Sequence, residues 1–243
     1  YNDKLREVST KFKEANVKAT ILDLRYNAGG SLDCVQLLAT ILVPSARMGT
    51  PMAYLEYNDK NIDKSTTIDF DQEVLKTGTN LNQNVLIVIT SGTTAGAAEM
   101  LLTSLYKKDQ YPNIIVMGSA SKGQTVATEQ FINETYRWSV NPVVCTVYNS
   151  DHVAGEEPFI LTPSDQFKIS ETSIDGTTNY SQFLPFGDPK ERMLSIAIQT
   201  LEGTYPPKDE DKEEETPSTK SFKIEKNVSS PASRRFAGGL RIK

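Results

Sequence analysis

The sequence is poor in the residues that build metal sites and disulfide frameworks. Its 243 residues include two cysteines, Cys34 and Cys145, and one histidine, His152. There is no C-x-x-C pair and no cluster of histidine with cysteine, so a structural zinc site is not expected. Both cysteines lie among apolar residues, and we expect two buried thiols. His152 lies in a polar stretch with no nucleophile elbow nearby, so a Ser-His-Asp triad is not expected either.

Long apolar runs and an excess of positive charge are also absent. No run approaches the roughly 18–20 apolar residues that span a bilayer. The 26 basic residues face 31 acidic ones, and the net charge of −5 argues against a nucleic-acid-binding surface. A Walker A loop and a G-x-G-x-x-G fingerprint are missing, which disfavours nucleotide binding. The chain begins with Tyr1 and not with Met, so we expect a fragment or a processed form.

What the sequence does contain is a core-forming alternation of strands and helices, with 38% hydrophobic residues. Residues 84–90 hold a continuous apolar run rich in β-branched residues, which is typical of a central strand covered on both faces. The order of elements predicts an α/β fold with a mostly parallel sheet flanked by helices and an added β-hairpin region. We expect the other strands at 17–24, 50–57, 65–70, 114–117 and 143–148, helices at 2–15, 31–42, 95–107 and 189–202, and the hairpin at 124–131 and 135–140.

The last expected helix has clear boundary signals. Asp188 and Glu191 fit a capping box, Pro189 fits the first helical turn, and Gly203 is expected to end the helix.

The composition changes after this helix. Residues 208–215 hold six acids and two lysines, whereas 220–243 hold seven bases and one acid. We therefore divide the chain into a domain at 1–203 and a charged tail at 204–243. The tail is expected to be solvated and mobile. The alternative is a segment that docks on this domain or on a partner. Its apolar residues could support a short strand: Phe222, Ile224, Phe236, Leu240 and Ile242.

Two strand-to-helix turns, at 23–30 and 93–99, are the places where a ligand is expected. In a parallel sheet both turns lie at the carboxyl ends of strands. Each helix start offers backbone N–H groups and a positive dipole end, so two such starts side by side suit an anion or a developing oxyanion. Gly29 and Gly30 either let the backbone approach a ligand closely or merely permit a tight turn.

Three ordered segments around these turns carry a specific residue pattern. Residues 22–30 read L-D-L-R-Y-N-A-G-G, residues 94–99 read T-A-G-A-A-E, and residues 117–124 read M-G-S-A-S-K-G-Q. Together they resemble the D-L-R-x-N-x-G-G, T-A-S-A-x-E and G-x-x-T-x-G-K motifs of the C-terminal processing (tail-specific) serine peptidases. Weaker likenesses at 161–165 and 185–191 follow in the family's order. The resemblance implies a crotonase-like core that extends to about residue 203.

The resemblance also implies the site residues. In this family a serine nucleophile and a desolvated, neutral lysine cut the peptide bond. The serine position falls on Gly96 and the lysine position on Gln124, so neither member of the dyad is present. The oxyanion and peptide-binding N–H groups carry over to Ala97 and to Gly29 or Gly30.

Lys122 is an alternative base, two residues before Gln124. If the segment is a strand, the two positions share a face but are displaced by roughly 6.5 Å, which is too far for a direct hydrogen bond unless the segment is shifted.

The function that the resemblance implies is therefore a peptide-binding pseudopeptidase, with no cofactor or metal. Its partner is expected to be a peptide or a protein C-terminus, and its location the bacterial cell envelope or periplasm. One alternative is an active serine endopeptidase, in which Gly96 is an engineered change or Lys122 is the base. A second alternative is a module for a hydrophobic ligand, because vertebrate relatives of the interphotoreceptor retinoid-binding type act on retinoids.

Overall fold

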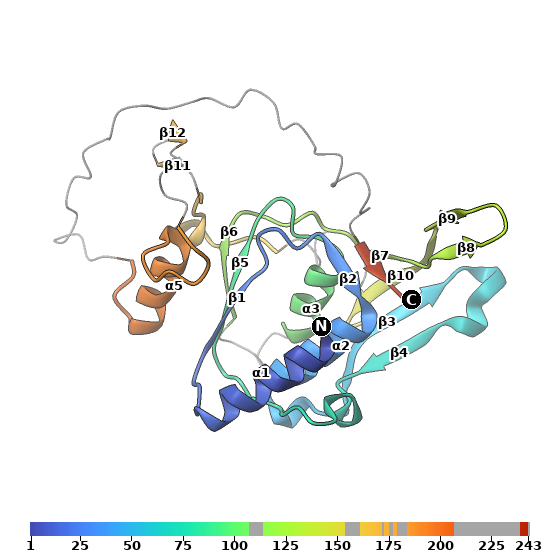
Figure 1. Cartoon of the computed structure of the whole chain (residues 1–243), viewed down its shortest axis with the longest axis horizontal. Helices are drawn as coiled ribbons and strands as arrows, with labels where there is room; N and C mark the ends of the chain where they lie inside the picture. The colour runs from blue at the N-terminus through green and yellow to red at the C-terminus, as the bar shows by residue number, and fades with distance from the viewer. Residues whose placement is uncertain are drawn as a thin grey trace.

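The computed structural model describes residues 1–106, 114–153, 161–171, 184–206 and 239–242, and the backbone of 173–174 and 177–178. Its strands form two main sheets and two small hairpins. The first sheet is parallel with the order β1-β5-β6, and the second is mixed with the order β2-β13-β7-β10-β3-β4 (Figure 1).

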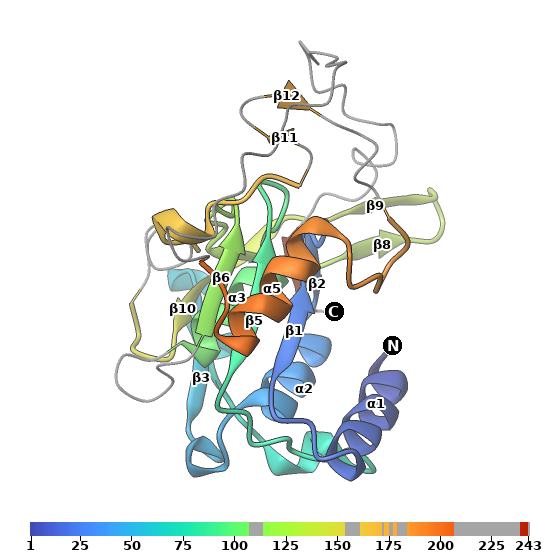
Figure 2. The ribbon, with the colours of Figure 1, turned by 90° about the vertical axis from the view of Figure 1, so that its left-hand side faces the viewer.

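The parallel sheet is built from β1 (Thr20–Asp23), β5 (Leu86–Thr90) and β6 (Ile114–Gly118). All residues of β5 are buried, which confirms a central strand covered on both faces. Its side chains alternate between two clusters: Leu86 and Val88 belong to the main core, and Ile87 and Ile89 to a smaller one. Figure 2 shows the helix of the smaller cluster, α5 (Arg192–Glu202), in front of these strands and α3 (Ala97–Leu105) behind them.

The mixed sheet lies beyond α3 and contains strands that the sequence did not place together. It comprises β2 (Gly29–Ser31), β3 (Pro51–Tyr57), β4 (Thr66–Asp69), β7 (Val126–Thr128), β10 (Val143–Asn149) and β13 (Gly239–Arg241). The pairs β7·β10, β10·β3 and β3·β4 are antiparallel, whereas β13 is parallel to both β2 and β7. The α/β fold with a mostly parallel sheet flanked by helices is therefore confirmed, with parallel pairs in the first sheet and in the β2-β13-β7 part of the second.

The four predicted α-helices are present as α1 (Asn2–Glu14), α2 (Leu32–Leu42), α3 and α5. The start of α5 differs from the expectation. Its N-cap is Glu191, whose carboxylate accepts a hydrogen bond from Leu194 N at 2.9 Å, whereas Asp188 accepts one from Lys190 N in the preceding turn. The helix thus begins after both acids, and Pro189 lies outside it. Gly203 ends the helix in the left-handed conformation with φ +72°, as predicted.

The hairpin is shorter than predicted and lies further along the chain. It pairs β8 (Phe131–Asn133) with β9 (Trp138–Val140), and Asn133 Oδ1 accepts a hydrogen bond from Tyr136 N in the turn. The first part of the expected arm, residues 126–128, belongs to the mixed sheet instead. The remaining short elements are the second hairpin, β11 (Ser173–Ile174) and β12 (Thr177–Thr178), and 3-10 turns at Ser45–Arg47, Asp59–Lys64, Gln72–Leu75 and Asp165–Phe167.

The charged tail is described only at its end. Residues 207–238, which make up most of the tail that was predicted to be mobile, lie outside the described residues. Residues 239–241 form β13, the strand between β2 and β7. The division of the chain after residue 203 stays a prediction.

The two thiols differ in burial. Cys145 is buried and Cys34 is half-buried, so the expectation of two buried thiols holds fully for Cys145 alone. Burial raises the pKa of both thiols, for Cys145 to about 11. Among the described helices, none combines the length and the apolar character needed to cross a membrane.

Candidate functional site

The two predicted strand-to-helix turns lie side by side. Thr94 Oγ1 donates a hydrogen bond to the carbonyl oxygen of Leu24 at 2.7 Å, and Ala95 N donates to Asn27 O at 3.0 Å. A Cβ atom on Gly30 would lie 3.3 Å from the Cβ atom of Ala97. The β1–β2 turn therefore lies directly against the start of α3, where the first N–H groups have no carbonyl partner within the helix.

A buried carboxylate joins the two positions to which the resemblance assigns the missing dyad. Glu99 Oε2 accepts hydrogen bonds from Gly96 N and from Gln124 N, each at 2.8 Å, and Oε1 accepts one from Gly123 N. Glu99 is fully buried. Sequence reasoning treated Glu99 only as part of a motif, although a glutamate three residues after a helix N-cap is a known signal for bonding back to the cap N–H.

Gly96 is the N-cap of α3 and has a conformation that side chains rarely adopt, with φ +57° and ψ −107°. It is buried. A Cβ atom built on it would lie 2.5 Å from Gly239 Cα and 2.7 Å from Leu240 N. The space in front of Gly96 is therefore filled by the backbone of β13.

Strand β13 brings the remaining predicted residues together. Gly239 pairs with Gly29, and Leu240 pairs with Gly30 on one side and with Ala127 on the other. A Cβ atom on Gly239 would lie 2.7 Å from Gln124 Nε2, so the Gln124 amide packs over this glycine. Figure 1 shows β13 in red beside β7 and β2. We call the space that is bounded by β2, β7 and the start of α3 the cleft.

Lys122, the alternative base, is exposed. Its backbone N–H donates to Thr94 O at 3.1 Å, which fixes the loop before β7 against the 93–99 turn. A catalytic lysine is neutral at pH 7 because it is desolvated, and an exposed position does not supply that desolvation.

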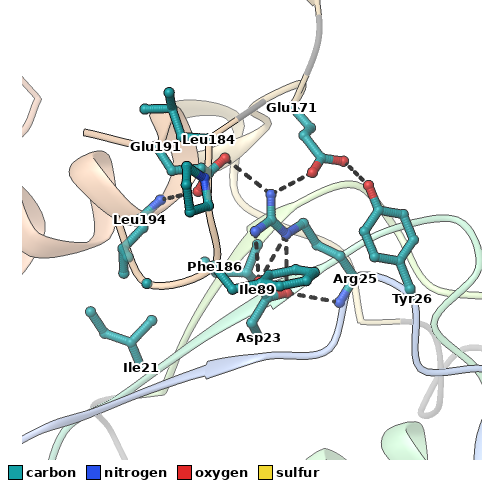
Figure 3. Close-up of a pocket in the computed structure, with 12 residues that line it drawn as sticks. Ile21, Asp23, Arg25, Tyr26, Ile89, Glu171, Leu184, Phe186, Glu191 and Leu194 are labelled. Carbon is teal, nitrogen blue, oxygen red and sulfur yellow. Dashed lines mark hydrogen bonds and ion pairs between the residues drawn. The ribbon is translucent and has the colours of Figure 1, made fainter. Parts of the chain in front are cut away.

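A second polar cluster lies under α5, around Arg25 (Figure 3). The guanidinium binds Asp23 at 2.6 Å, Glu171 at 2.7 Å and Glu191 at 3.1 Å, and Tyr26 OH donates to Glu171. Burial alone would lower the pKa of Arg25, but the hydrogen bond to Asp23 and the three carboxylate charges raise it above its usual value. Asp23 and Arg25 both lie in the first strand-to-helix turn that the sequence singled out, whereas nothing in the sequence pointed to the two distant glutamates.

This cluster lines a pocket of about 470 Å³. The lining of the pocket also includes apolar side chains, among them Ile21, Ile89 and Leu194. His152 lies elsewhere, stacked on Tyr54 and 2.6 Å from Glu56 Oε1. Within the described residues, no group of three or more histidines, cysteines or acids is placed to hold a metal ion.

Comparisons with known proteins identify a family and solved structures that are similar to this chain. The model of peptidase family S41 matches residues 1–156. Among solved structures, a Bacteroides fragilis protein assigned to the S41 proteases is 37% identical with a TM-score of 0.73, and the match covers 84% of this chain and 49% of that one. The photosystem II D1 C-terminal processing protease matches at 17% identity and a TM-score of 0.48, over 70% of this chain and 39% of its own. No curated protein matches.

The chain thus spans about half the length of the Bacteroides fragilis protein. The family model nevertheless covers more than half of this chain, in the region that holds the cleft and both turns. The chain therefore belongs to peptidase family S41, the C-terminal processing peptidases.

Proposed function

We propose that this chain forms the cleft of a peptide-binding pseudopeptidase. One observation carries the proposal: Gly96 and Gln124 are held by the same buried carboxylate of Glu99, and neither carries a nucleophile or a base. Glycine has no side chain, and a neutral amide cannot take a proton at pH 7. The framework that would position a dyad is therefore present without the reacting groups.

The cleft has what is needed to bind a peptide main chain. Its walls are the edges of β2 and β7, and both pair with an extended segment. Addition of a strand to a sheet edge is a common mode of peptide recognition, in which main-chain hydrogen bonds give affinity. The Ala97 N–H, at the first turn of α3, adds a donor at the positive end of the helix dipole.

The partner that we propose is a peptide or a protein C-terminus, as in the family whose motifs this chain resembles. The same resemblance supports a location in the bacterial cell envelope or periplasm. Because the chain spans about half of its Bacteroides fragilis relative, these statements about the whole protein are also proposals.

The two alternatives have less support. An active endopeptidase would need a serine at position 96, where this chain has glycine, and its alternative base, Lys122, is exposed. A hydrophobic ligand would need a cavity without a charged wall, but the pocket under α5 contains Asp23 and Arg25 in a paired network. The strand-pairing edges of the cleft favour a peptide.

The test is peptide cleavage and peptide binding in matched preparations. Hydrolysis of a quenched library of C-terminally apolar peptides is measured for the parent chain, for the double revertant Gly96→Ser, Gln124→Lys, and for Gly92→Ser. Gly92 has an ordinary φ and open space around its Cβ position, which makes it a matched control. We expect no hydrolysis of the peptides by the parent chain or by the control, and hydrolysis by the double revertant.

Binding of the same peptides is measured by fluorescence anisotropy on the parent and on Gly239→Val, in which a side chain would weaken the contact between β13 and Gln124. Binding without cleavage supports a pseudopeptidase even if the revertant stays silent. Cleavage by the parent, or no binding to either chain, contradicts the proposal.

A further inference from the structure

The end of the chain occupies the position of a peptide ligand in the cleft. We propose that the cleft selects an extended peptide with glycine opposite Gly96 and an apolar residue directly after it, and that residues 239–242 of this chain are its resident ligand. This inference rests on the proposed function and names the ligand class for the same cleft.

The first support is the pairing on both sides of β13. Gly239 and Leu240 pair with Gly29 and Gly30 of β2, and Leu240 also pairs with Ala127 of β7. Beyond the strand, Ile242 N donates to Thr128 O at 3.0 Å. A four-residue segment that has two strand partners has the geometry of a peptide added to a sheet, and both neighbours fix its direction as parallel.

The second support is a set of close approaches that require glycine. A Cβ atom on Gly29 would lie 2.3 Å from Gly239 N, and one on Gly96 would lie 2.5 Å from Gly239 Cα. On the ligand side, a Cβ atom on Gly239 would lie 2.7 Å from Gln124 Nε2, and its φ of +147° is also one that side chains rarely adopt. The position opposite Gly96 therefore admits glycine and excludes larger residues.

The third support is the burial of the next residue. Leu240 is 1% exposed and belongs to the main core cluster, whereas Arg241 and Ile242 are half-buried. The ligand pattern that follows is glycine, then a buried apolar residue, then two residues with partial access to solvent. The absence of a side chain on Gly96 is what makes room for the glycine of this ligand.

A ligand that belongs to the same chain competes strongly with any free peptide. Linking two binding partners by a peptide chain gives effective concentrations up to the millimolar range. A free peptide with micromolar affinity is therefore expected to bind the intact chain at least 10-fold more weakly than a chain whose residues 239–242 have left the cleft.

The first measurement is hydrogen exchange of the full-length parent by mass spectrometry. We expect protection of amides 240–242 comparable to that of β7. Exchange of these amides at the rate of an unstructured peptide, with β7 still protected, overturns the proposal without any variant.

The second measurement uses full-length variants that act on opposite sides of the contact. Gly239→Val alters the ligand and leaves the cleft intact, and Gly239→Ala is a milder form of it should the valine chain not fold. Gly96→Ala alters the cleft, and Gly92→Ala is its control. We expect both Gly239 variants and Gly96→Ala to lose protection at 240–242 by at least 10-fold, and Gly92→Ala to match the parent.

The third measurement is the binding of a labelled peptide with the sequence of residues 232–243. We expect it to bind the Gly239→Val chain, to bind the parent at least 10-fold more weakly, and not to bind Gly96→Ala. A peptide that carries Val in place of Gly239 is expected not to bind any of them. If the natural peptide fails to bind the Gly239→Val chain while library peptides bind it, the ligand assignment is wrong and the proposed function stands. If the natural peptide binds and no library peptide does, the ligand assignment stands and the broader function fails.

Discussion

The guanidinium of Arg25 lies 3.1 Å from the carboxylate of Glu191, the residue that caps α5. The pair joins the first strand-to-helix turn to the last helix of the parallel-sheet layer. Both side chains are about nine-tenths buried. The turn that carries Gly29 and Gly30 is therefore held from beneath by a helix that begins more than 160 residues later.

Replacing Arg25 with leucine is expected to destabilise the fold by about 3 kcal/mol, because removing one partner of a buried ion pair leaves the other charge uncompensated. Chemical denaturation of the full chain measures the change. Lys168→Ala, which removes an exposed ion pair with Asp165, is the control and is expected to have little effect. An Arg25→Leu chain as stable as the parent would show that the network does not brace the turn.

Replacing Glu99 with glutamine is expected to destabilise the fold by about 2–4 kcal/mol, because the amide keeps one acceptor atom and turns a donor toward backbone N–H groups. The local effect is measured by hydrogen exchange, with faster exchange expected at Gly123 and Gln124. Glu73→Gln, at an exposed position, is the matched control. Unchanged exchange at these two amides would contradict the role of Glu99 as the link between them.

The Cys145 thiol is expected to react slowly with alkylating reagents. Burial raises its pKa to about 11, so at pH 8 the thiolate fraction is about 100-fold or more below that of an ordinary thiol. In a Cys34→Ser chain, the reaction rate is expected to rise with pH to a midpoint near 11. A midpoint near 8.5 in a folded chain would contradict the prediction.

The same shift has a consequence for stability. The folded state binds the Cys145 proton more tightly than the unfolded state does, so its contribution is fully present below about pH 8.5. It is lost as the pH rises toward 11. Denaturation of the Cys34→Ser chain at pH 8 and pH 10 measures this loss, and Cys34→Ser with Cys145→Ala, which has no thiol, serves as the control.

Replacing Gly203 with alanine is expected to cost about 1 kcal/mol, because its φ of +72° is unfavourable for a residue with a Cβ atom. No neighbouring atom lies within 4 Å of the added carbon, so the cost is conformational and not a clash. Thermal unfolding measures it. Gly92→Ala, which has the same open surroundings and an ordinary φ, is expected to be neutral or slightly stabilising.

Local sequence patterns predicted most elements of the fold. The apolar run at 84–90 became the buried β5, because a continuous apolar run reports burial on both faces. The predicted N-terminal helix is present as α1, but its buried residues are Arg6 and Ser9, whereas Val8 and Phe12 are exposed. The start of α5 was misplaced because aspartate is a preferred N-cap residue and glutamate is not, which favoured Asp188, whereas the N-cap in the structure is Glu191.

The pairings between distant segments were not predictable in this way. The short strand β2 consists of Gly29, Gly30 and Ser31, which have no strand propensity of their own and form a ladder only because β13 lies beside them. Glu171 likewise reaches Arg25 across 146 positions. The composition of these segments carries no information about which partner they meet.

The same difference between local patterns and distant pairings applies to the candidate site. The motif positions were assigned to Gly96 and Gln124 from spacing within each segment, which is local information. That both meet a single carboxylate, and that Gly239 lies between them, depends on the assembly of three segments.

The position of β13 in the mixed sheet has a consequence for the order in which the protein is completed during synthesis. It is the sole strand between β2 and β7 in this sheet, as far as the described residues show. Its Gly239 pairs with Gly29, which precedes it by more than 200 positions in the sequence. At typical rates of translation, β13 follows β10 out of the ribosome by about 5–20 s. During that interval β2 and β7 have been synthesised and β13 has not, so we expect newly made molecules to bind peptides more readily than mature molecules do.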